Sequence, residues 1–169
     1  MHQTTLIWRY RRHIAAATSL LLALSVQTAF AQDHFSGAWK IEKSEPAPWV
    51  DKPGLIEKNE VKNLVGARVE IAKDHIDGPE PLACKMPHYE ISRNRAEGLF
   101  EGGLGEIADS KITADDIATK LGFKQRPIPS LVTGCPIEIE YHAIDDDHLI
   151  FALNNSLYRM TRTHAASKP

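Results

Sequence analysis

Residues 137–162 read IEIEYHAIDDDHLIFALNNSLYRMTR, and this stretch decides the fold class. Apolar and polar residues alternate along it, which is typical of strands with one buried face. Asn154-Asn155 can supply the positive φ angles that a two-residue hairpin needs. That hairpin pairs Phe151 with Tyr158, and directly opposed residues share one face of a sheet. We therefore expect a single apolar face made of Leu149, Phe151, Leu153, Tyr158 and Met160.

Three further stretches predict short strands: residues 36–43, 66–72 and 88–93. One helix is expected near residues 113–121, where Thr113 and Asp116 form a variant of the capping box. Residues 44–64 and 124–130 are expected to be mainly loop, because proline removes a backbone donor and restricts the residue before it. The predicted fold is mainly β: a curved antiparallel sheet or a small barrel, with a sandwich left open.

Residues 1–31 have the pattern of a cleaved bacterial signal peptide. Arginines precede an apolar stretch at 14–26, and Ala29-Phe30-Ala31 fits the cleavage site. About 13 apolar residues are too few for a membrane anchor, which needs roughly 20. We expect export to the periplasm or the medium, by a route that the sequence leaves open. This leaves one β-rich domain over 32–163 and a disordered tail over 164–169.

The charge balance indicates which partners are expected. The whole chain holds 20 basic and 22 acidic residues, a formal charge of −2. The segment 1–31 contains three arginines and no acidic residue, so its removal changes the formal charge to −5. A mildly acidic domain is poorly suited to bind nucleic acid or an anionic membrane. We expect neither as a partner of the mature protein.

The two cysteines, Cys84 and Cys135, predict one disulfide. An even number of cysteines in an oxidising compartment is typically bridged. The bridge would close a loop of about 50 residues and stabilise the fold by roughly 4 kcal/mol. The alternative is a nucleophilic thiolate at Cys135 with His142 as its base. Export favours the disulfide.

Two groups of polar residues in the stretch 137–148 suggest chemistry. The first group could bind a metal, because imidazole and carboxylate ligands suit zinc. A solvated acidic turn is nevertheless its expected state. These weak metal candidates are His142, Asp145, Asp147 and His148. The second group shares one strand face and consists of Glu138, Glu140 and His142. Paired carboxylates can act as general acid and base. Such residues on one face of a strand more often form its solvated side. We therefore assign no catalytic residue, no metal and no cofactor.

Residues 98–105 are rich in glycine but match neither the P-loop nor the dinucleotide fingerprint. They predict a mobile loop or a pair of β-bulges. Leu99, Phe100 and Leu104 would make it an exposed interaction loop, because exposed apolar patches mark contact sites. A G-x-S-x-G hydrolase elbow is absent from the sequence.

Gly37-Ala38-Trp39 near the mature N-terminus and the strand carrying Arg159 and Arg162 resemble the structural signature of lipocalin-like (calycin) β-barrels. The resemblance implies an up-and-down antiparallel barrel that often binds a small hydrophobic molecule. It also implies three residues that close the barrel base: Gly37, Trp39 and Arg162. In the hairpin register Arg162 points inward and Arg159 outward, so Arg162 is expected to lie over the Trp39 ring.

The function expected from the sequence is that of a small exported, non-enzymatic binding module. Its partner would be a small apolar ligand, as in lipocalins, or a protein, as for an inhibitor or accessory protein. The alternative is a periplasmic enzyme that uses His142 with nearby carboxylates. An internal apolar pocket favours the ligand. A buried histidine beside a carboxylate in a cleft favours the enzyme.

Overall fold

The computed structural model describes residues 34–50, 57–109 and 111–164. The chain divides into two units after His34, and the strands of the described residues all lie in the unit Phe35–Pro169. The predicted signal peptide lies outside the described residues, as does the predicted tail beyond His164. In the described part of the chain, no helix combines the length and the apolar character needed to cross a membrane.

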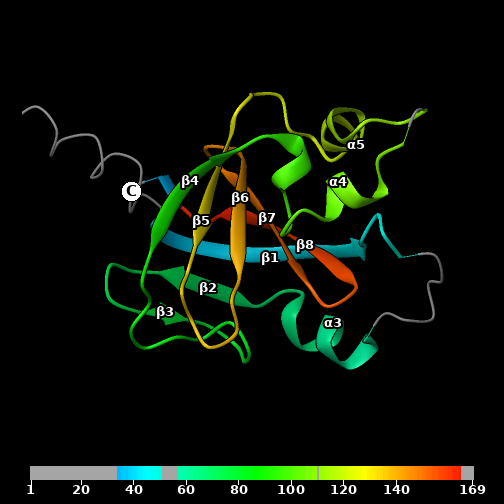
Figure 1. The fold of residues 1–169 in the computed structure, drawn as a ribbon. Helices are drawn as coiled ribbons and strands as arrows, with labels where there is room; N and C mark the ends of the chain where they lie inside the picture. Colours follow the sequence, from blue (N-terminus) through cyan, green and yellow to red (C-terminus); the bar gives the residue numbers. More distant parts are fainter. Residues whose placement is uncertain (1–33, 51–56, 110, 165–169) are drawn as a thin grey trace, which may run out of the picture. The chain divides into compact units, whose positions relative to one another are not determined.

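Eight strands form one antiparallel sheet in the order β3-β2-β1-β8-β7-β6-β5-β4. Neighbours in sequence are neighbours in the sheet, except that β1 lies beside β8 and the seam falls between β3 and β4. The sheet therefore curls into a half-barrel with β3 and β4 at its edges (Figure 1). The strands are β1 Gly37–Pro46, β2 Arg68–Ile71, β3 Ile76–Asp77, β4 Glu90–Asn94, β5 Ile128–Val132, β6 Glu140–Asp145, β7 His148–Leu153 and β8 Ser156–Arg162.

The predicted disulfide is confirmed, and it links the two sides of the open seam. Cys84 follows β3 and Cys135 follows β5, and their Cα atoms are 6.1 Å apart. The Tyr89 hydroxyl, just before β4, donates to the carbonyl of Ala72 at 2.8 Å, just after β2. These two links hold together the parts of the sheet that share no backbone ladder.

The predicted C-terminal hairpin is confirmed. Phe151 lies opposite Tyr158, and the two rings stack with centroids 5.1 Å apart and planes 17° apart. Asn154 in the turn has φ 50°, as the two-residue loop requires. The expected face belongs to the inner core of the half-barrel, whose fully buried members include Trp39, Ile41, Val69, Tyr141, Ala143, Leu149, Phe151, Tyr158 and Met160.

The outer face is also buried over the C-terminal strands, so the expectation of strands with one buried face is wrong there; on β1 and β2 the outer-face residues Lys40, Arg68 and Glu70 are exposed. Three short helical segments pack on the buried part of this face and form a second core with residues of β7 and β8. Ile150 and Leu157, which alternate with the inner-face residues, are fully buried in this second core. The helical segments are η2 Ala96–Gly98, α4 Gly103–Ile107 and α5 Ala114–Lys120, of which α4 and α5 lie close together in Figure 1.

Helix α5 matches its prediction, including the cap. The Thr113 side chain accepts the backbone N–H of Asp116, and the Asp116 carboxylate accepts the backbone N–H of Thr113. Gly122 follows with φ 97°, in the left-handed conformation that commonly ends a helix.

Three segments predicted as loops are ordered elements instead. The glycine-rich stretch 98–105 contributes to η2 and α4 rather than to a mobile loop. Residues 58–64 form helix α3, which buries Leu64 in the inner core. Within 124–130, β5 begins at Ile128 despite Pro129. The ladder between β5 and β6 begins only at Ser130, so the missing N–H of this proline interrupts no pairing with β6.

The expected contact between Trp39 and Arg162 is present. The two residues are opposed on β1 and β8, and the Arg162 guanidinium carbon lies 4.1 Å from the Trp39 ring centroid. Gly37 has φ 119°, and a Cβ there would lie 3.0 Å from Arg162 Nη1. Glycine thus permits the close approach that places the guanidinium over the ring. Arg159, on the opposite face, pairs instead with Glu45 at 2.7 Å.

We expect Trp39 and Arg162 to be energetically coupled. A double-mutant cycle of Trp39→Phe with Arg162→Met, followed by urea denaturation, should give a coupling free energy of about 0.5–2 kcal/mol. The matched control pairs Trp39→Phe with Arg159→Met, which lies on the other face of β8 and should be additive. Equal coupling in both cycles would contradict the contact.

Candidate functional site

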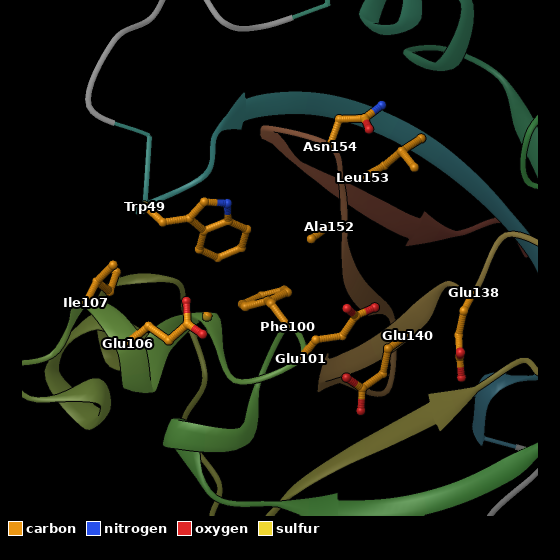
Figure 2. A pocket seen from close by; sticks show the side chains of 11 residues that line it. Trp49, Phe100, Glu101, Glu106, Ile107, Glu138, Glu140, Ala152, Leu153 and Asn154 are labelled. Carbon is orange, nitrogen blue, oxygen red and sulfur yellow. The ribbon is translucent and has the colours of Figure 1, made fainter.

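A cleft of about 730 Å³ opens on the outer layer, where the turn before α4 meets strands β6 and β7 (Figure 2). Its volume lies within the range of small-molecule sites, roughly 300–1,000 Å³. Four carboxylates and two aromatic rings dominate its walls. The lining residues are Trp49, Phe100, Glu101, Gly103, Glu106, Ile107, Glu138, Glu140, Ala152, Leu153 and Asn154.

One wall of the cleft is a turn with an unusual backbone. Phe100, Glu101 and Gly102 have consecutive positive φ angles of 54°, 57° and 90°. A bulky side chain rarely adopts this left-handed region; each such non-glycine residue costs about 1–3 kcal/mol, and it persists only where its surroundings impose the conformation. A residue of β6 accepts a backbone N–H group of this turn, because Phe100 donates to Nε2 of His142 at 3.1 Å.

His142 is fully buried, and both of its ring nitrogens are used. Nε2 accepts from the Phe100 amide, so the ring proton of the neutral imidazole resides on Nδ1. Nδ1 lies 2.7 Å from Oγ of Ser130 and donates to it. Burial lowers the pKa of His142 to about 3. The ring edge packs against the rings of Phe100 and Phe123, with centroids 4.6 and 6.4 Å away.

Glu140 stands between the buried layer and the cleft, with 13% of its side chain exposed. Oε1 accepts from Nδ2 of Asn94 at 2.8 Å, and Oε2 lies 3.5 Å from the neutral His142 ring. Burial raises the pKa of the Glu140 carboxyl. The hydrogen bonds from Asn94 and the Glu101 amide oppose this shift, and the carboxylates of Glu101 and Glu138 add to it.

The charge of the cleft has one sign. Its titratable lining residues are all glutamates, at positions 101, 106, 138 and 140. Within the described ranges of the chain, Glu101, Glu106 and Glu138 have no ion-pair partner. Figure 2 shows Glu106 on one side of the Phe100 ring and the other three on the opposite side. Carboxylates of one sign in a concave site concentrate negative potential there.

The aromatic wall consists of Trp49 and Phe100. Their ring centroids are 5.7 Å apart and their planes are tilted by 50°. Trp49 lies directly on the backbone at Gly103, where a Cβ would be 3.2 Å from two atoms of the indole ring. A side chain at this position would displace the indole, so the glycine at the start of α4 shapes the cleft.

The prediction that Leu99, Phe100 and Leu104 form an exposed interaction loop is wrong. Leu99 and Leu104 are 0% exposed and Phe100 is 6% exposed, because these side chains anchor the outer layer to the sheet. Phe100 nevertheless lines the cleft, so the segment is part of the candidate site for another reason. The expected wet face of β6 is likewise buried at His142.

The four weak metal candidates do not form one group of possible ligands. His142 is buried with both nitrogens engaged, whereas His148 bonds Asp145 at 2.7 Å and Asp147 pairs with His164 at 3.3 Å. Among residues 34–50, 57–109 and 111–164, no group of three or more histidine, cysteine, aspartate or glutamate side chains has a geometry that could hold a metal ion.

Sequence reasoning missed Trp49, Glu101 and Glu106 as parts of one site, and Ser130 and Asn94 as supports of His142 and Glu140. The glycine-rich pattern did mark the segment that forms one wall. Comparison with known proteins finds no matching family model, no matching curated protein and no matching solved structure.

The buried histidine predicts a specific pH dependence. Between about pH 6.5 and pH 3 the unfolded chain binds a proton at His142 that the native state does not. The free energy of unfolding should therefore fall as the pH falls through this window, by about 1 kcal/mol per pH unit from this group. His142→Gln should remove that contribution, as measured by urea denaturation at pH 7, 6 and 5.

The raised pKa of Glu140 changes the free energy of unfolding in the opposite direction. Wild type and His142→Gln both contain Glu140, so the difference between their pH profiles isolates His142. His75→Gln, which replaces a half-exposed histidine, serves as the matched control. Parallel pH profiles for wild type and His142→Gln would contradict a buried neutral imidazole.

Proposed function

We propose that this protein is an exported, non-enzymatic binding module that takes a small organic cation in the cleft beside Phe100. One observation carries the proposal: four carboxylates and the rings of Trp49 and Phe100 line the same cleft. None of the lining side chains is basic. Negative charge attracts a cation, and an aromatic face binds an alkylammonium group through the ring quadrupole. A ligand with a positive nitrogen and an apolar body satisfies both.

The sheet supports a lipocalin-like architecture for this module but a different ligand position. Strands that follow one another in sequence and the β1–β8 pairing agree with an eight-stranded up-and-down barrel. In lipocalins the ligand enters the barrel interior. Here the inner face is packed with large buried side chains, including Trp39, Tyr141 and Phe151. The outer cleft is therefore the better candidate for the ligand site.

The observations favour binding over catalysis at His142. A general base needs a free nitrogen within reach of a substrate proton. His142 is fully buried, and its two nitrogens already bond Phe100 and Ser130. Export to the periplasm or the medium is part of the same proposal. It is supported by the sequence pattern of residues 1–31 and by the single disulfide, which suits an oxidising compartment.

The test compares choline with its neutral carbon isostere, 3,3-dimethylbutan-1-ol, by isothermal titration calorimetry on the purified mature protein. The two probes have nearly the same shape, so only the charge differs. We expect choline to bind more tightly by about tenfold at low salt, and added salt to reduce this difference. A titration with spermidine extends the test to a linear polycation.

Three variants locate the site. Trp49→Ala should weaken choline binding several-fold, in line with a cation–π contribution of about 0.5–2 kcal/mol. Glu106→Gln removes one lining carboxylate, so it should also weaken choline binding and reduce its salt dependence. Asp77→Asn on β3 removes a carboxylate outside the cleft and should bind as wild type. Equal affinity for choline and the isostere, or no binding of either cation, would contradict the proposal.

A further inference from the structure

We infer that His142 is a positioning residue of the cleft, whose Nδ1–H imidazole holds Phe100 in the left-handed conformation that builds the aromatic wall. The inference rests on the proposed function only for its binding readout. Its structural content concerns a buried hydrogen-bond chain that begins in the sheet and ends at the turn.

The hydrogen-bond chain starts in the sheet, where the register of two strands places its first two side chains together. Ser130 on β5 and His142 on β6 are directly opposed, and both side chains are fully buried on the outer face. Their opposition brings Oγ to 2.7 Å from Nδ1. A hydroxyl can accept or donate, but an imidazole nitrogen without a proton can only accept. With Nε2 occupied as an acceptor, Nδ1 carries the proton and Ser130 accepts it.

The hydrogen-bond chain ends at the Phe100 amide. This N–H is buried and donates to Nε2 at 3.1 Å, and its residue has φ 54°. A buried amide without an acceptor is costly, so the bond strongly favours the conformation that makes it. The turn is thus held from β6 by a bond to a side chain that is itself fixed by Ser130.

The consequence for the cleft follows from the direction of the side chains. The left-handed conformation places the Phe100 ring against both His142 and Trp49, at centroid distances of 4.6 and 5.7 Å. The same turn carries Glu101, a lining carboxylate, and leads into Gly103 under the indole. Without the acceptor at Nε2, Phe100 would relax toward negative φ, and the aromatic wall would lose its geometry.

Two variants separate the contributions of the two ring nitrogens of His142. His142→Gln has a side chain long enough to keep an acceptor near the Nε2 position, whereas His142→Asn keeps a polar group only near the Nδ1 position. We expect His142→Asn to weaken choline binding about tenfold and His142→Gln to restore it to within about threefold of wild type. His75→Gln is the matched control and should bind as wild type. Equal binding by His142→Asn and wild type would overturn the inference.

A spectroscopic readout decides the inference independently of the ligand. ¹⁵N NMR of the native protein should show the imidazole proton on Nδ1 and an unprotonated Nε2 at pH 7, with a coupling across the hydrogen bond to the Phe100 amide. A proton on Nε2 would overturn the inference, even if His142→Asn fails to fold.

The Phe100 backbone separates this inference from the proposed function. The three-bond coupling between its amide and α protons reports φ, and it should change in His142→Asn but not in His142→Gln. If choline does not bind wild type while these NMR results hold, the proposed function fails and the positioning role stands. An unchanged Phe100 coupling in folded His142→Asn would overturn the positioning role.

Discussion

The turn at Phe100, which forms one wall of the cleft, depends on the hydrogen bond from its amide to Nε2 of His142. This bond joins the middle of the sheet to a turn that is far away in sequence, and it does so inside the protein, where an unmade bond is costly. Around it the leucines of the same segment, Leu99 and Leu104, pack on the outer face. Dispersion and burial hold the layer on the sheet, and the polar bond fixes the conformation of the turn.

The second constraint is that the C-terminal strands of the sheet are covered on both faces, whereas the outer face of β2 is exposed. The inner face is curled around its own side chains, and the disulfide and the Tyr89 hydroxyl link its two edges across the seam. Over the C-terminal strands the outer face is covered by short helices that have little stability alone, because helices of five to seven residues are marginal without tertiary packing. The cleft lies at the margin of this cover, beside the ends of β6 and β7.

The sequence predicts the features that depend on neighbours in the chain. The hairpin at Asn154, the capped helix α5 and the pairing of the cysteines follow from local chemistry or from simple counting, and all three are present. The resemblance to lipocalin-like barrels also predicts a contact between Trp39 and an arginine of the last strand, and the hairpin register selects Arg162 over Arg159. These predictions need no knowledge of how the middle of the chain packs.

The cleft could not be predicted in the same way. Its walls come from Trp49, from the turn at Phe100 and from β6, which are brought together only by the packing of the outer layer. The pattern of Glu138, Glu140 and His142 is typical of a solvated strand face, but His142 is buried beneath the rings of Phe100 and Phe123. Positive φ at Phe100 has no signal in the sequence, since phenylalanine rarely adopts it.

Native-state hydrogen exchange of the Phe100 amide, followed by NMR, tests whether the sheet holds this turn. We expect this amide to be protected to the same degree as the amides of β6 and β7, because its acceptor is buried in the sheet. Rapid exchange of Phe100, at the rate of an exposed loop and while β6 and β7 remain protected, would contradict the claim that the sheet holds the turn.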